Sequence, residues 1–295
     1  AMGHSVVALD SMFRGSETNL EAIFRRENFA LYAGDVRDLD DLDACVEALG
    51  GLDLVYHLAA INGTKWFHEA AHSVIDVNVN GTLRTLELAM AHEAKYVFAS
   101  SPEAFGEALL QPLTDGDPMV FTDPSKHQRH SYGGSKYLGE VACQHAARDG
   151  LNVQILRPFN AYGPRLSGDE YGQVIGMFFH QLLDSGELNV HGDGSQTRSF
   201  TWIDDVVDGF VKAGMQDLPS GGVFNIGSTE EVAILDLANR IAKLSNSVTI
   251  THGEGHHGDV IRRLPNTSNC EKLLGWKSKV TLDEGLKLMW DTFTL

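Results

Sequence analysis

The sequence predicts an α/β fold in which a parallel sheet carries helices on both faces. Short β-branched runs alternate along the chain with longer stretches of helical spacing, an order that is typical of parallel sheets. The chain has 295 residues, 43% apolar and 21% charged, which is enough to bury a large core in one sizeable domain or two smaller ones. No internal repeat or low-complexity linker interrupts the alternation.

Each of the β-branched runs is expected to form a strand. The expected strands are Val6–Leu9, Phe29–Tyr32, Leu52–Leu58, Tyr96–Ala99 and Val153–Leu156. Helical spacing is clear at Leu39–Leu49 and Val79–Ala91. Because ligands of such sheets bind beyond the carboxyl ends of the strands, the residues that follow each run are the candidates for chemistry.

Composition excludes several classes of function. A formal net charge of −17 without a basic stripe opposes binding to nucleic acid or anionic lipid. No run approaches the roughly 18 apolar residues of a membrane helix and no secretory signal is recognisable, so we expect a cytoplasmic protein. The cysteines Cys45, Cys143 and Cys270 are far apart and lack CxxC spacing, which favours reduced packing residues over disulfides or zinc ligands.

Acidic and small residues follow the first three predicted strands. Asp10 is placed to accept both hydroxyls of an adenosine ribose and would repel a 2′-phosphate, which favours NAD over NADP. Asp35 and Val36 would lie beside the adenine, and Ala59 and Ala60 permit the close approach of a ligand. An acidic residue after a strand is also explained by a turn or a helix N-cap, but several such positions along one edge favour a dinucleotide site.

The fourth strand and a later helix carry the candidate catalytic group. Ser101 and Glu103 follow the strand end, and the stretch HSYGGSKYLGE places Tyr132 and Lys136 four residues apart, on one face of a helix. Because an ammonium favours a nearby phenolate, this spacing predicts that Lys136 lowers the pKa of Tyr132 and makes it a base. Ser101 would bridge the tyrosine and a substrate hydroxyl.

Motifs along almost the whole chain carry a family resemblance. They are VVALD, GDVRD, VYHLAA, NVNGT, FASSPEAFG, YGGSK, LRPFNAYGPR, GDGSQTRSFTWIDD, VFNIGS and CEKLLGW. In these the sequence resembles the extended short-chain dehydrogenase/reductase family, the NAD-dependent epimerases and dehydratases of sugar nucleotides, of the UDP-glucose 4-epimerase type. The resemblance implies a Rossmann-type NAD-binding domain over 1–164 and 202–227 and a sugar-nucleotide-binding domain over 165–201 and 228–295.

The same resemblance implies roles for individual residues. The implied catalytic residues are Ser101, Tyr132, Lys136 and, at a second acidic position, Glu103. The residues implied around NAD are Asp10, Asp35, Val36, Leu58, Ala59, Ala60, Asn78, Tyr132, Lys136 and Phe159. Those implied around a nucleotide-diphospho-sugar are Asn160, Arg165, Arg198 and Arg263. Guanidinium forks suit a diphosphate, although Arg198 and Arg263 are also explained as ion-pair partners on the surface.

The implied activity is that of a NAD-dependent epimerase that transiently oxidises the sugar, most often at C4. Pro102 stands where the 4,6-dehydratases of the family carry an acidic residue, which disfavours a dehydratase; Phe105 and Asn266 also depart from the family pattern. A decarboxylase of a nucleotide-linked uronic acid is the near alternative. A dehydratase, an oxidoreductase that releases NADH and a sugar-nucleotide binder without hydride chemistry are further ones.

Two further expectations concern metal and partners. The glycine-rich stretch HGEGHHGD, with His252, His256 and His257, favours a loop over a metal site. The helical stretches NVNGTLRTLELAMAHE and YGGSKYLGEVACQHAA carry apolar and small residues on more than one face. That pattern predicts a homodimer, although a wholly buried helix has the same pattern.

In a dinucleotide-binding fold, a strand ending in Asp10 is typically the second one. A first strand and its glycine turn, roughly 25 residues, are expected before it, and neither GxGxxG nor GxxGxxG occurs near the start. Three explanations stay open: a longer polypeptide that includes this segment, a natively short chain whose sheet closes up or borrows a strand, and a shortened chain with Ala1–Gly3 as a cloning remnant.

Overall fold

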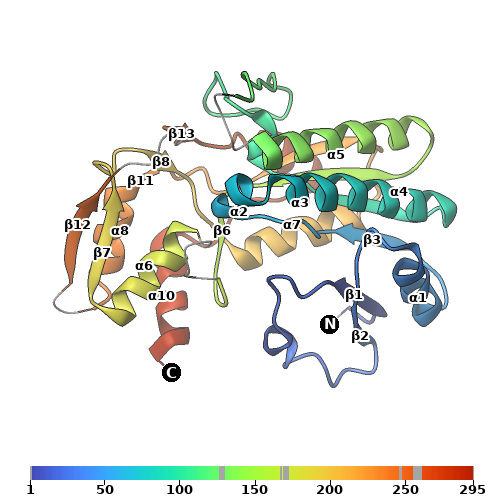
Figure 1. The fold of residues 1–295 in the computed structure, drawn as a ribbon, viewed down its shortest axis with the longest axis horizontal. Helices are drawn as coiled ribbons and strands as arrows, with labels where there is room; N and C mark the ends of the chain where they lie inside the picture. Colours follow the sequence, from blue (N-terminus) through green and yellow to red (C-terminus); the bar gives the residue numbers. More distant parts are fainter. Residues whose placement is uncertain are drawn as a thin grey trace.

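The computed structural model describes residues 2–125, 130–166, 168, 173–245, 248–254 and 261–294. The predicted α/β fold is confirmed, with parallel strands between layers of helices (Figure 1). The strands are β1 Val6–Asp10, β2 Phe29–Ala33, β3 Leu54–His57, β4 Lys95–Ala99, β5 Val153–Pro158, β6 Ala161–Tyr162, β7 Glu187–His191, β8 Thr197–Arg198, β9 Thr201–Trp202, β10 Gly222–Ile226, β11 Val232–Ala233, β12 Thr249–Gly253 and β13 Arg262–Arg263.

The helices follow the strands in the predicted alternation. They are α1 Leu39–Leu49, α2 Thr64–Glu69, α3 Ala71–Ile75, α4 Gly81–Ala91, α5 His130–Arg148, α6 Val174–Asp184, α7 Ile203–Met215, α8 Ile234–Ala242, α9 Ser268–Leu274 and α10 Leu282–Thr294. Short helical turns are η1 Glu17–Leu20, η2 Asp76–Asn80 and η3 Pro102–Phe105. The turn η2 is π-helical and joins α3 to α4 without a break, so the helix predicted from Val79 starts earlier, at Ala71.

The parallel strands form two separate sheets. One has the order β10-β5-β4-β3, and the other is the pair β1-β2. Within the described part of the chain, β1 pairs only with β2 and β3 pairs only with β4. Each of these two strands therefore has an edge without a strand partner, and in Figure 1 the β1-β2 pair lies below the end of the larger sheet.

Alternating side chains on the larger sheet build a core on each of its faces. Tyr96 and Phe98 pack with residues of α4 and α5 on one face. Val97, between them, packs on the opposite face with Ala213 of α7 and Leu274 of α9. This period of two is what a strand buried on both sides requires, and it fixes α5 over the sheet.

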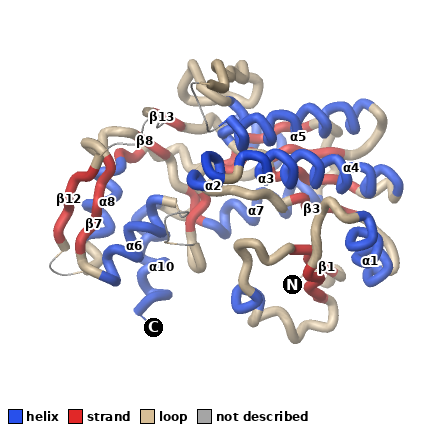
Figure 2. The backbone as a smooth tube through the Cα atoms, viewed as in Figure 1, coloured by secondary structure: helices blue, strands red, loops and turns tan. Residues whose placement is uncertain are grey.

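The later part of the chain builds a second core around short sheets. β7 pairs with β12, and β8 lies between β11 and β13. The core between these strands and α6, α8 and α10 contains Phe178, Phe179, Leu237 and Met289 (Figure 2). It also includes Tyr162 and Trp202, next to the predicted domain borders at 164 and 202, so the division into two domains stays a prediction.

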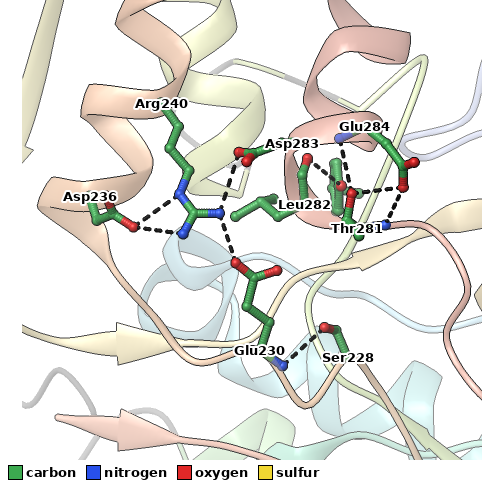
Figure 3. Close-up of polar contacts among 9 residues, drawn as sticks. Ser228, Glu230, Asp236, Arg240, Thr281, Leu282, Asp283 and Glu284 are labelled. Carbon is green, nitrogen blue, oxygen red and sulfur yellow. Dashed lines mark hydrogen bonds and ion pairs between the residues drawn. The ribbon is translucent and has the colours of Figure 1, made fainter.

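Arg240 joins three segments of this second part. Its guanidinium pairs with Asp236 on the same helix, α8, with Glu230 in the preceding loop and with Asp283 at the start of α10 (Figure 3). The arginine is 24% exposed, so these contacts are only partly screened by water. The start of α10 is thereby tied to α8.

No described helix is both long enough and apolar enough to cross a membrane. All three cysteines are free, as predicted.

Candidate functional site

The candidate catalytic residues meet where β4 ends and α5 begins. Ser101 follows β4 and caps η3, its Oγ accepting a 3.2 Å hydrogen bond from the backbone N–H of Glu103. Pro102 occupies the first position of η3, where the missing N–H is not needed. The side chains of Ser101 and Tyr132 are hydrogen-bonded to each other.

Tyr132 and Lys136 lie one turn apart on the buried face of α5, as predicted. Tyr132 is only 6% exposed and Lys136 only 3%. The Nζ atom of Lys136 donates a 2.7 Å hydrogen bond to the carbonyl oxygen of Ala99 and lies 5.8 Å from the centre of the Tyr132 ring. The structure therefore brings Ser101, Tyr132 and Lys136 together.

The prediction that Lys136 lowers the pKa of Tyr132 is wrong for this structure. Burial raises the pKa of Tyr132, Glu103 adds to the rise, and the hydrogen bond with Ser101 opposes it. Burial also lowers the pKa of Lys136, to about 8. The physical reason is that the low-dielectric surroundings penalise both the phenolate and the ammonium. The four-residue spacing reflects only the attraction between these two charges.

An aromatic side chain covers Tyr132, the candidate catalytic tyrosine, and the sequence did not predict this contact. The ring of Phe67 on α2 stacks on that of Tyr132 with the ring centres 4.7 Å apart and an interplanar angle of 14°. The Oγ atom of Ser131 donates to the carbonyl oxygen of Phe67 over 3.1 Å, which ties α2 to α5. Only the stretch KWF, with two adjacent aromatic residues in a polar segment, was available as a signal.

Glu103 acts electrostatically on Tyr132 and is paired with an arginine. Its carboxylate accepts a hydrogen bond from Nη1 of Arg263, and its charge acts on Tyr132. Gly133, next to Tyr132, allows the backbone of Glu103 to approach α5, since a Cβ at position 133 would lie 2.5 Å from the carbonyl oxygen of Glu103. Arg263 is thus an ion-pair partner, but a buried one rather than one on the surface, and its partner is itself a candidate catalytic residue.

Arg263 keeps two hydrogen-bond donors available although it is only 5% exposed. Its Nε and Nη2 atoms are buried and have no partner among the described residues. Arg198 is its register partner on the neighbouring parallel strand β8, so both guanidinium groups start on the same face of this small sheet. Buried unpaired donors on a cation are costly, so Arg263 favours an anionic ligand.

The other predicted substrate contacts are partly engaged within the protein. Asn160 lies beside the β8–β9 segment, with Nδ2 donating to the carbonyl oxygen of Ser199 over 2.8 Å. Arg165 is exposed, and its Nη1 donates to the carbonyl oxygen of Asn19 over 2.5 Å. In this structure Arg165 is therefore directed to the N-terminal segment, and its predicted contact with a diphosphate stays a prediction.

Most of the predicted NAD residues lie along the carboxyl ends of β1, β2 and β3. Asp10 is exposed, and Leu58 is 60% exposed beside half-buried Ala59 and Ala60. These exposed and small residues fit one edge of a dinucleotide site. The carboxylate of Asp35 is paired with Arg37, which holds the pKa of that carboxyl below its usual value.

The remaining predicted NAD residues are buried, and their side chains serve the protein itself. Val36 is 9% exposed, and the ring of Phe159 is enclosed with Phe105 and Leu113. The N–H of Phe159 donates to the carbonyl oxygen of Ile226 over 2.8 Å, and its carbonyl oxygen accepts from Oγ1 of Thr201 over 3.0 Å. Asn78 accepts from the N–H of Ile61 over 2.7 Å and donates to Oγ of Ser135 over 3.0 Å. For Phe159 and Asn78 the structure thus gives no support to the predicted side-chain contact with NAD, because packing and hydrogen bonds already occupy them.

Within the described residues, no three metal-ligating side chains are grouped. His252 contacts the carbonyl oxygen of Gly192 through Nδ1 at 2.9 Å, and His256 and His257 lie outside the described residues.

Comparisons with known proteins agree with this arrangement. A family model described as "NAD dependent epimerase/dehydratase family" matches residues 1–227. A UDP-N-acetyl-alpha-D-glucosaminuronate decarboxylase of Bacillus cytotoxicus is 32% identical over 292 residues, which is 97% of this chain and 88% of the relative. UDP-glucuronic acid decarboxylase 3 of Arabidopsis thaliana is 31% identical over 299 residues, covering 99% of this chain and 82% of the relative.

Solved structures resemble the whole chain as well. The UDP-glucose 4-epimerase of Thermotoga maritima with UDP-glucose superimposes with a TM-score of 0.89 at 26% identity, covering 99% of this chain and 91% of that one. The UDP-glucuronic acid 4-epimerase of Bacillus cereus in complex with NAD gives a TM-score of 0.85 at 26% identity, covering 100% and 92%.

Proposed function

This chain belongs to the NAD-dependent epimerase/dehydratase family, and we propose that within it the protein is a decarboxylase of a nucleotide-linked uronic acid. The relatives at 32% and 31% identity are decarboxylases of UDP-linked uronic acids, which favours the near alternative of the sequence analysis over the epimerase first expected. An epimerase is the competing function, since solved epimerases share the fold.

The observation that carries the proposal is the pair of free donors on Arg263. A uronic acid differs from a neutral sugar by a carboxylate at C6, and a guanidinium fork can bind a carboxylate through two parallel hydrogen bonds. The Nε and Nη2 atoms are buried and without a partner among the described residues, while Nη1 is held by Glu103. Glu103 thus orients the arginine, and it also acts electrostatically on Tyr132.

The catalytic group supports oxidation at C4 followed by loss of carbon dioxide. NAD, when bound, supplies the acceptor and later the donor of the hydride. Tyr132 takes the proton of the C4 hydroxyl, and the hydrogen bond from Ser101 is the described contact that favours its phenolate. The C4 ketone makes the C6 carboxylate part of a β-keto acid, so the C5–C6 bond breaks and carbon dioxide leaves.

The last steps restore the hydroxyl and the protein. C5 takes up a proton, the hydride returns to C4, and Tyr132 returns its proton to the C4 oxygen. No step uses an acid at position 102, which is compatible with Pro102. Lys136, held at the carbonyl oxygen of Ala99, keeps a positive charge near the phenol.

The test is a comparison of sugar nucleotides with NAD added. The substrates are UDP-glucuronate, UDP-N-acetylglucosaminuronate and, as neutral controls, UDP-glucose and UDP-N-acetylglucosamine, with products followed by proton NMR and carbon dioxide released from C6-labelled substrate. We expect release of labelled carbon dioxide from a uronic acid alone. Interconversion of C4 epimers with the carboxylate retained would reject decarboxylation and establish the epimerase.

Arg263→Lys separates the role of the guanidinium fork from that of the charge. Lysine keeps a cation for Glu103 but loses Nε and Nη2. Losing a charge-assisted bidentate contact is expected to raise KM for the uronic acid on the order of 10- to 100-fold. An unchanged KM would remove Arg263 from carboxylate recognition.

We further propose that the chain forms a homodimer through α4 and α5. These helices lie side by side on the sheet (Figure 1) and leave Leu83, Met90, Leu138 and Val141 between 37% and 49% exposed. Exposed apolar residues gathered on neighbouring helices are typical of an interface that a second copy covers.

A further inference from the structure

A buried ion pair joins the catalytic helix to the sheet. Glu140 on α5 and Arg157 on β5 have side chains that are 6% and 2% exposed. Arg157 binds both carboxylate oxygens, with Nε donating to Oε1 over 2.8 Å and Nη2 donating to Oε2 over 2.6 Å. Since a buried ion pair can often be replaced by apolar side chains without loss of stability, its presence calls for an explanation besides stability.

Glu140 holds the backbone segment that carries the catalytic hydroxyl. The Oγ atom of Ser100 donates to Oε1 of Glu140 over 2.5 Å. On one side of Ser100, the carbonyl oxygen of Ala99 accepts the hydrogen bond of Lys136. On the other side, Ser101 is hydrogen-bonded to Tyr132. A single carboxylate thus anchors the three-residue segment to which both members of the Tyr–Lys pair are bonded.

Arg157 extends the anchor to the second half of the site. Its guanidinium lies 4.5 Å from the centre of the Phe105 ring, and Phe105 ends the helical turn η3 that carries Glu103. Its Nη1 atom donates to the carbonyl oxygen of Asp115 over 2.9 Å.

The loop at Asp115 continues this connection to Arg263. Two residues before Asp115, the N–H of Leu113 donates to the carbonyl oxygen of Leu264 over 2.8 Å. Leu264 directly follows Arg263 in the chain. The Glu140–Arg157 pair and the loop at Asp115 therefore connect the segments that carry Ser101, Glu103 and Arg263.

We propose that the Glu140–Arg157 pair is a positioning element that holds residues 99–105 so that Ser101, Lys136 and Glu103 converge on Tyr132. The proposal rests on the proposed function for the roles of those residues. Neither Glu140 nor Arg157 needs to touch the substrate, and both act through the backbone segment and η3.

The pKa of Lys136 provides a readout that depends on the charge of Glu140 and that a purely structural role of Glu140 would leave unchanged. Burial lowers the pKa of Lys136 to about 8, and the charge of Glu140 on the same helix opposes this shift, whereas burial raises the pKa of Cys143 and keeps its thiol neutral. From β3, Lys136 faces His57, whose pKa burial lowers to about 3, so the imidazole is neutral near pH 7. Glu140→Gln is isosteric and removes a charge that favours the ammonium, so the pKa of Lys136 should fall further.

Three variants separate positioning from stability. Ser100→Ala removes only the hydroxyl that links Glu140 to the segment. Glu140→Met combined with Arg157→Met removes both charges together and keeps the volume, a change that is compatible with folding. Arg240→Met is the matched control, because it breaks an ion pair of comparable chemistry on α8, outside the catalytic group (Figure 3).

If they fold, Ser100→Ala and the double methionine variant should lower kcat on the order of 10- to 100-fold and change KM little. The reason is that reacting groups misplaced by up to about 1 Å react more slowly although the substrate still binds. Arg240→Met should keep the kcat of the unaltered chain. A folded double methionine variant with unaltered kcat and pH profile would overturn the proposal.

A lysine titration by NMR keeps the proposal independent of the proposed function. In the unaltered chain one lysine should titrate well below the others, and Glu140→Gln should shift that midpoint to lower pH. Absence of turnover with every sugar nucleotide would reject the proposed function alone. A titration midpoint of Lys136 that is the same in Glu140→Gln as in the unaltered chain would reject the positioning role.

Discussion

Lys136 donates its 2.7 Å hydrogen bond to the carbonyl oxygen of Ala99 at the end of β4, so that its ammonium lies beside the phenol of Tyr132 without bonding to it. The ammonium is buried, and burial lowers its pKa from 10.5 to about 8. The cation is therefore kept near the tyrosine at the expense of the stability of the folded chain.

Lys136→Met should abolish turnover and raise stability at pH 7 by up to about 3 kcal/mol, because each unit of the lowered pKa corresponds to about 1.4 kcal/mol. Because the folded chain holds this proton less tightly than the unfolded chain, the charged lysine is destabilising in full below pH 8 and the penalty disappears as pH rises toward 10.5. Urea denaturation at pH 7 and pH 10 measures the effect. A stability gain of equal size at both pH values would contradict the assignment to the buried charge.

Turnover by the unaltered chain should fall as pH rises through about 8, because Lys136 loses the proton that makes it a cation. The dependence of kcat/KM on pH measures this limb. A profile that stays flat from pH 7 to pH 10 would mean that the charge on Lys136 does not take part.

Tyr132→Phe should reduce turnover by at least about 100-fold while leaving the affinity for the nucleotide sugar nearly unchanged. The phenol oxygen moves the proton, whereas the ring, stacked on Phe67, is retained by phenylalanine. Calorimetric titration with UDP-glucuronate measures binding separately from turnover. Substantial residual turnover would assign proton transfer to another group.

Gly133→Ala should destabilise the chain by about 1–3 kcal/mol and lower turnover, because its Cβ would lie 2.5 Å from the carbonyl oxygen of Glu103. Gly134→Ala is the matched control on the same helix, since a Cβ there meets nothing within 4 Å and alanine favours the helix by roughly 0.5–1 kcal/mol. Thermal unfolding of both variants checks the pair. Equal melting temperatures would show that α5 can move away from η3 at little cost.

Leu138→Asp should dissociate the proposed homodimer, because it puts a charge on the exposed apolar face of α5, where Leu138 is 49% exposed. Leu288→Asp on α10 changes a residue of similar exposure, 46%, away from that face and should leave the mass unaltered. Light scattering coupled to size-exclusion chromatography measures both. An unaltered chain that is already monomeric would exclude the dimer.

Residue patterns were sufficient to predict several strands and helices and to name a candidate catalytic group. Alternating apolar runs predict β4 and β5, since a strand buried on both faces needs apolar side chains on both, and the four-residue spacing of Tyr132 and Lys136 already places them on one face of a helix. Motifs were also sufficient to recognise the family, because stretches such as YGGSK and LRPFNAYGPR are local in the chain.

The distribution of charge among these residues could not be predicted before the chain was folded. The direction of the Tyr132 pKa shift depends on burial beneath Phe67, which belongs to a segment far from α5 in the sequence. Glu103 pairs with Arg263, which is 160 positions away in the sequence, and Glu140 pairs with Arg157, which is 17 positions away. Electrostatic energies depend on distance and on exclusion of water, and neither quantity is defined until the chain is folded.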